Sequence, residues 1–123
     1  MEKEFLPYDR ALKLKAIGFE ERCLTYYENG IAMINSVLTV DGWDYNTSFL
    51  TYASRPTFQQ VFRWFREKYD LHGAVRKRNG NGNIYFEQIF DEDVLHNGSF
   101  DTYEEAELAC LDKLIEIVEG RES

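Results

Sequence analysis

The sequence contains few of the residues that usually carry chemistry. Its 123 residues include only two cysteines, two histidines and two prolines. Cys23 and Cys110 lie far apart and lack the short spacing of a zinc site. We therefore expect two reduced thiols that pack as small apolar side chains, with a disulfide between them as the alternative.

Long apolar runs are also missing. No stretch approaches the roughly 18 consecutive apolar residues of a membrane-spanning helix. The first ten residues, MEKEFLPYDR, are mixed in charge and lack the apolar core of a secretion signal. These features predict a cytoplasmic protein that does not associate with membranes.

No pattern in the chain indicates a catalytic centre. His72 and His96 have no neighbouring cluster of cysteine and carboxylate. The glycines between Asn79 and Asn83 are not followed by the Lys-Ser/Thr pair of a phosphate loop. The acidic run at 91–93 lacks the ligand spacing of a calcium loop. We therefore expect no enzyme activity, no cofactor and no metal site.

The net charge of −8 is unevenly distributed along the chain. Residues 1–54 carry 5 basic and 8 acidic groups, residues 55–90 carry 7 and 3, and residues 91–123 carry 2 and 11. The basic middle and the acidic end either attract one another or present faces of opposite sign to partners. Ordinary solvated surfaces explain the same pattern.

Three helices are predicted from start and stop signals. The first begins at Pro7 and ends at Gly18, with Tyr8, Ala11, Leu12 and Leu14 on its apolar face. The second begins after Thr57, which forms a capping box with Gln60. The third begins after Thr102 in the same way and ends at Gly120.

The second predicted helix, within PTFQQVFRWFREKYDL, carries most of the aromatic side chains. At 100° per residue one stripe is apolar, which indicates a core-facing side. Trp64 falls beside this stripe and suits either a half-buried position or an interface. The stripe consists of Phe58, Val61, Phe62, Phe65 and Tyr69.

The third predicted helix has an unusually wide apolar arc. Leu108 and Ile115 lie almost opposite the centre of its main stripe. The arc predicts a helix lodged between two layers or shared with a second subunit. The main stripe consists of Tyr103, Ala106, Cys110, Leu114 and Ile117, widened by Leu111 and Val118.

Two hairpins are expected between the helices. Asn29-Gly30 is a preferred two-residue turn between β-prone segments, and Asn79–Asn83 is expected to be the loop of the second hairpin. A third strand is expected at Val94–Ser99 and another at Ser48–Tyr52. Together these elements predict a single α+β domain of residues 1–123, with small antiparallel sheets packed against two to three helices.

Three blocks of the sequence resemble a family of short uncharacterised proteins from Bacteroidetes-type gut bacteria and their phages and mobile elements. The blocks are YDRALKLKAIGFEERCLTYY, PTFQQVFRWFREKYDL and FDTYEEAELACLDKLIEIV, and they cover about half of the chain. The resemblance implies an intracellular protein of bacterial or phage origin. It implies no activity and no functional residues.

Residues 73–115 more weakly resemble the small DNA-binding domains of the AP2 and integrase arm-binding type. That resemblance implies a sheet that reads a DNA groove and is braced by a helix. The residues in the matching positions would be Arg76, Lys77, Arg78 and Tyr85. The acidic run at 91–93 departs from the pattern.

The function predicted from these observations is binding rather than catalysis. We expect a small accessory or regulatory protein of phage or mobile-element type that acts on a protein partner, with a homodimer as another form of association. The candidate partner-binding residues are Trp64, Arg63, Arg66 and Trp43, because arginine and tryptophan dominate binding hot spots. The alternative is a nucleic-acid-binding protein that uses the basic hairpin at 74–90.

Overall fold

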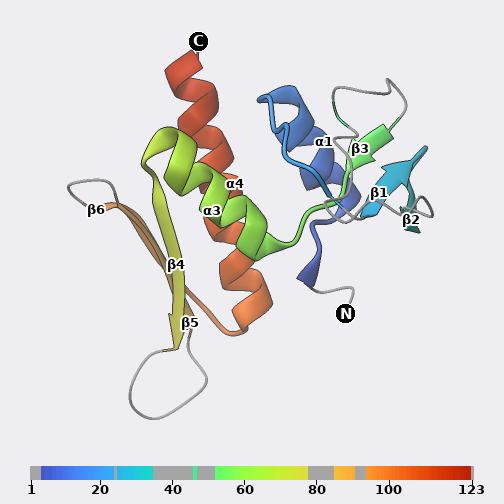
Figure 1. Cartoon of the computed structure of the whole chain (residues 1–123). Helices are drawn as coiled ribbons and strands as arrows, with labels where there is room; N and C mark the ends of the chain where they lie inside the picture. The colour runs from blue at the N-terminus through green and yellow to red at the C-terminus, as the bar shows by residue number, and fades with distance from the viewer. Residues whose placement is uncertain are drawn as a thin grey trace. The chain divides into compact units, whose positions relative to one another are not determined.

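The computed structural model describes residues 4–23, 25–34, 46, 52–77, 85–90 and 94–122 (Figure 1). The described residues contain three helices and two three-stranded antiparallel sheets, so the chain belongs to the α+β class as predicted. They divide into two compact units, Met1–Phe58 and Gln59–Ser123. Each unit is considered by itself, and the prediction of one domain stays a prediction.

The first unit begins with helix α1 (Tyr8–Ala16), with Pro7 as its N-cap. The helix ends as predicted, because Gly18 adopts a φ of 93° and the Phe19 amide donates to the Leu14 carbonyl. Phe19 is buried beside this end. The predicted apolar face was only partly right, since Tyr8 and Leu12 are 37% and 42% exposed.

The sheet of the first unit has the order β2-β1-β3. Strands β1 (Thr25–Glu28) and β2 (Ile31–Ile34) form the predicted hairpin. At its turn Asn29 and Gly30 both have positive φ, 52° and 84°, as a type I′ turn requires. Strand β3 (Tyr52–Ser54) pairs with the other side of β1. The strand predicted at Ser48–Tyr52 falls mainly outside the described residues.

One face of this sheet carries the core of the first unit. Tyr27 and Ala53 lie opposite one another on β1 and β3, and both are buried together with Ala11 of α1. The Tyr27 hydroxyl donates a hydrogen bond of 2.7 Å to the Leu6 carbonyl, which satisfies its polar end inside the core. The ring of Tyr8 packs edge-on against Tyr27 at 5.2 Å. The core and α1 therefore lie on this face of the sheet, and the other face is turned away from α1.

The second unit contains a sheet of order β4-β5-β6. Strands β4 (His72–Lys77) and β5 (Tyr85–Phe90) pair in the predicted antiparallel manner, although the expected loop at Asn79–Asn83 lies outside the described residues. Strand β6 (Val94–Phe100) confirms the predicted third strand. The register places Gly73, Glu87 and Ile89 on one face and His72, Gln88 and Phe90 on the other.

Helix α4 (Tyr103–Glu122) covers the first of these faces. It begins as predicted, because the Glu105 amide donates a 3.1 Å hydrogen bond to the Thr102 hydroxyl. A β-carbon added at Gly73 would lie 2.9 Å from the Cys110 sulfur, so the absence of a side chain lets the helix approach β4 closely. The predicted end at Gly120 was wrong: the helix continues to Glu122, since glycine costs only about 1 kcal/mol inside a helix.

The wide apolar arc of α4 is largely buried. Ile115, placed opposite the main stripe, is 1% exposed, whereas Tyr103 of the main stripe is 44% exposed. The buried residues therefore extend well beyond a single stripe, which agrees with a helix lodged between layers. They are Ala106, Cys110, Leu111, Leu114, Ile115 and Val118.

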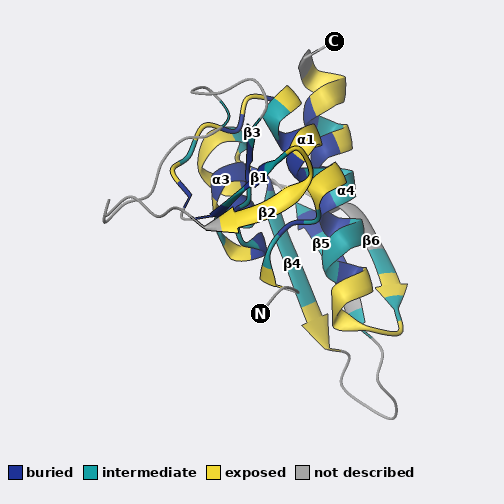
Figure 2. Cartoon of the chain, turned by 90° about the vertical axis from the view of Figure 1, so that its right-hand side faces the viewer, coloured by how far each residue is buried: buried dark blue, intermediate teal, exposed yellow. Residues whose placement is uncertain are grey.

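Helix α3 (Phe58–Tyr69) lies beside α4 on the same side of this sheet, as Figures 1 and 2 show. Phe65 is fully buried and Phe62 only partly so, which weakens the prediction that both belong to the core. Trp64 is 3% exposed, so it is buried more deeply than the half-buried position that the sequence offered as one alternative. Its ring packs edge-on against Tyr69 at 5.4 Å and lies under the Lys68 ammonium at 5.2 Å.

Candidate binding surfaces

The face of the β2-β1-β3 sheet away from α1 carries exposed apolar side chains. Ile31 is 66% exposed and Met33 is 37% exposed, and both belong to the edge strand β2. Figure 2 shows β2 as exposed. Met33 pairs with Tyr26, and Ile31 pairs with Glu28. Large aliphatic side chains in this setting are typical of a protein contact surface.

Two tyrosines extend this surface toward β3. The rings of Tyr26 and Tyr52 lie 4.9 Å apart, and both residues are partly buried. Loss of contact with water raises the pKa of the Tyr52 hydroxyl above its usual value, and the nearby Glu28 carboxylate raises it further. A side-chain hydrogen bond with Glu28 acts in the same direction, so the phenol keeps its proton. We call Tyr26, Ile31, Met33 and Tyr52 the apolar face.

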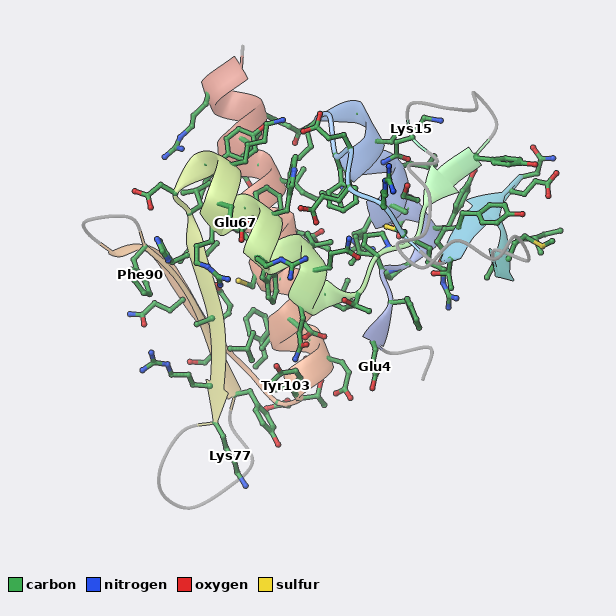
Figure 3. The ribbon with its side chains drawn as sticks, viewed as in Figure 1. Glu4, Lys15, Glu67, Lys77, Phe90 and Tyr103 are labelled. Atoms are coloured by element: carbon green, nitrogen blue, oxygen red, sulfur yellow. The ribbon has the colours of Figure 1, made fainter. Side chains whose placement is uncertain are left out.

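The second unit also has a sheet face that α4 does not cover. His72 and Phe90 lie opposite one another there, with ring centroids 5.6 Å apart and planes 12° from parallel. Asp70 places a carboxylate oxygen 3.0 Å from Nε2 of His72. Arg76 is exposed on the same face, four residues farther along β4. We call His72, Arg76, Gln88 and Phe90 the open face; Figure 3 shows Phe90 on the side turned away from α4.

The predicted partner-binding residues do not form one surface in the described structure. Arg63 and Arg66 are exposed on α3, whereas Trp64 between them is buried. Trp43 lies outside the described residues. Trp64 lies beside the predicted apolar stripe of α3. It is buried because the apolar contacts of the helix extend beyond that stripe. Whether any of these residues binds a partner stays a prediction.

The predicted nucleic-acid-binding residues are divided between the two faces of the β4-β5-β6 sheet. Arg76 is on the open face, but Tyr85 lies with its ring 5.9 Å from Tyr103, on the side of α4. Lys77 is exposed where β4 ends, and Arg78 lies outside the described residues. The expectation that Tyr85 acts together with Arg76 was therefore wrong, because the register places them on opposite sides.

Glu87 of β5 and Cys110 of α4 are buried titratable side chains, and Glu107 of α4 is half-buried. Glu87 is fully buried, and a β-carbon at Gly98 would lie 3.0 Å from its Oε1 atom. Burial, and then the charge of Glu87, raise the pKa of Cys110 to about 12, so this thiol is protonated and unreactive at neutral pH. Burial, and then Glu104, raise the pKa of Glu107 to about 7. These shifts arise from packing in the core.

Within the described ranges, no group of three His, Cys, Asp or Glu side chains is arranged to hold a metal ion. Both cysteines are buried free thiols rather than a disulfide. His72 is on β4 and His96 on β6, with β5 between them. None of the described helices is long and apolar enough to span a bilayer.

The apolar face was missed in the sequence, although a signal for it exists. The strand IAMI has no polar residue at alternate positions, as a strand with one solvated face normally has. Tyr27 and Ala53 fill the face of the sheet that packs on α1. The apolar side chains of β2 are therefore not needed to complete that core. A continuous apolar run on a short hairpin strand was therefore the signal.

The chain was also compared with known proteins. No family model, no curated protein and no solved structure matched it. The resemblance to proteins of Bacteroidetes-type bacteria and their phages accordingly stays a prediction.

Proposed function

We propose that the chain is a small cytoplasmic accessory or regulatory protein, of phage or mobile-element type, that acts by binding a protein partner through the apolar face. The observation that supports the proposal most strongly is the exposure of Ile31, at 66%, on the same face of the sheet as Met33. Burying such side chains against a partner releases about 25 cal/mol for each Å² of apolar surface. The proposal assigns no catalysis to the chain.

The position of β2 adds a second means of attachment. Within the described residues β2 pairs only with β1, so its other edge carries backbone donors and acceptors suited to an added strand. An extended partner segment would gain main-chain hydrogen bonds from this edge and apolar contacts from Ile31 and Met33.

The partner on this view is a different protein, not a second copy. The net charge of −8 makes two copies repel one another, and it favours a neutral or basic partner. Light scattering should therefore find a monomer at micromolar concentration. A dimer that Met33→Glu dissociates would overturn this choice of partner.

The test is affinity capture from bacterial lysate treated with nuclease, using wild type, Met33→Glu and Leu12→Glu. Leu12 is a matched control, because it is 42% exposed against 37% for Met33 and lies on α1. Loss of a binding hot spot of 2 kcal/mol weakens binding about 30-fold. Met33→Glu should lose the stoichiometric partner and Leu12→Glu should keep it. Equal recovery by the two variants would contradict the proposal, as would a partner that nuclease releases.

A further inference from the structure

We propose that the open face of the β4-β5-β6 sheet binds single-stranded nucleic acid. This is a second activity on a second surface, independent of the apolar face of the first unit. Helix α4 packs on the opposite side of the sheet, against Gly73, so the open face is not covered by that helix. It combines an aromatic pair at one end with positive charge at the other.

The aromatic end consists of His72 and Phe90. Their rings lie nearly parallel, 12° apart at 5.6 Å, and the side chain of His72 is 36% exposed. The contact between Nε2 of His72 and Asp70, at 3.0 Å, holds the imidazole in this orientation. Exposed flat rings on a sheet are the platforms on which unpaired bases stack, with little dependence on sequence.

The basic end lies four residues along β4, about 13 Å away at the usual rise of a strand. Arg76 is exposed on this face, and Lys77 is exposed at the end of β4, where its pairing with Tyr85 places it on the side of α4. Neither forms an ion pair with any residue in the described ranges. The carboxylate of Glu87, the acidic residue of β5, is buried on the opposite face. A strand whose bases stack at His72 and Phe90 would therefore meet the Arg76 cation along its phosphates.

A single strand fits this face better than a duplex or a protein. In a duplex the bases are already stacked and paired, and exposing them costs a few kcal/mol. The apolar face of the first unit offers a protein large aliphatic side chains, whereas the open face offers His72, Phe90, Arg76 and Gln88, which suit a stacked base and its phosphate. Gln88, between the two ends, presents both a donor and an acceptor to a base edge.

The test is fluorescence anisotropy with a labelled 20-nucleotide oligothymidylate and a mixed duplex of equal length, at 50 and 200 mM salt. Phe90→Leu keeps an apolar side chain but removes the ring. It should weaken binding at least about fivefold, the equivalent of 1 kcal/mol for one stacked base. Arg76→Ala should also weaken binding, whereas Arg66→Ala, which removes the same charge from α3, should not. One phosphate contact, made by Arg76, predicts an affinity about 2.6-fold lower at the higher salt concentration.

Several results would overturn the inference. They are the absence of oligothymidylate binding by wild type, tighter binding of the duplex, and equal losses in Arg76→Ala and Arg66→Ala. If Phe90→Leu instead lowers capture of the protein partner, the open face is a protein surface and the inference is wrong. Met33→Glu should bind the oligonucleotide like wild type, so this proposal and the proposed function can fail separately.

Discussion

Replacing Gly73 with alanine tests the packing of α4 on the second sheet. The added β-carbon would lie 2.9 Å from the Cys110 sulfur and 3.1 Å from Cδ1 of Leu114, both closer than normal contact. Overpacking of this kind costs about 1–3 kcal/mol. Alanine also restricts the unfolded chain, which returns about 0.4–1 kcal/mol. We therefore expect Gly73→Ala to lower the free energy of unfolding by about 1–2 kcal/mol.

A double-mutant cycle separates this clash from a general effect of substitution. Cys110→Ala alone should cost about 1 kcal/mol, because it removes one buried group of methylene size. In the double variant the new methyl group occupies the space of the lost sulfur, so the combined cost should be smaller than the sum. Residues in contact typically show coupling energies of 0.5–3 kcal/mol. Gly120→Ala is the control, since its β-carbon would meet no atom within 4 Å.

The assay is urea unfolding followed by the fluorescence of Trp64, in a background where Trp43 is phenylalanine. Trp64 is buried in the second unit, so its emission reports unfolding of the unit that contains Gly73. A Gly73→Ala variant at least as stable as wild type would refute the packing of α4 described above. Additive costs in the cycle would show that the alanine and Cys110 do not meet.

Three further predictions concern single side chains of the core. Phe65→Ala should cost about 3–5 kcal/mol in urea unfolding, and Phe62→Ala clearly less, because only Phe65 is fully buried. Glu107 has a pKa raised to about 7, so its contribution to stability is greatest below the unfolded value of 4.5 and is lost as the pH rises toward 7. In a plot of melting temperature against pH, Glu107→Gln should remove the decline between pH 4.5 and 7. An unchanged plot would contradict the raised pKa of Glu107. Cys23 and Cys110 are both buried, so a thiol reagent at pH 8 should label them only after denaturation; rapid labelling of the folded chain would refute their burial.

The parts of the fold that could be predicted from the sequence are those decided by local chemistry. The Asn29-Gly30 turn, the cap at Thr102 and the end of α1 at Gly18 each depend on a few adjacent residues. Periodicity likewise indicated the wide apolar arc of α4, most of which is buried. These features do not require knowledge of what packs against them.

The features that could not be predicted depend on neighbours distant in the sequence. A helical wheel assumes one covered side, so it could not show that Trp64 is buried. Whether Tyr85 and Arg76 lie on the same face depends on the register of β4 and β5. The turn residues alone do not determine that register. The apolar run of β2 was a local signal that was missed, but which of its side chains are exposed depends on Tyr27 and Ala53, which fill the covered side of the sheet.

The central claim is that the apolar face is the surface on which a protein partner binds. Hydrogen–deuterium exchange of the purified chain, alone and in complex with the captured partner, tests it most directly. We expect slower amide exchange in β2 and β3 on binding, since both strands carry residues of the apolar face. It predicts little change in α4 of the second unit. Protection confined to α3 or α4, with β2 exchanging as in the free chain, would contradict the account.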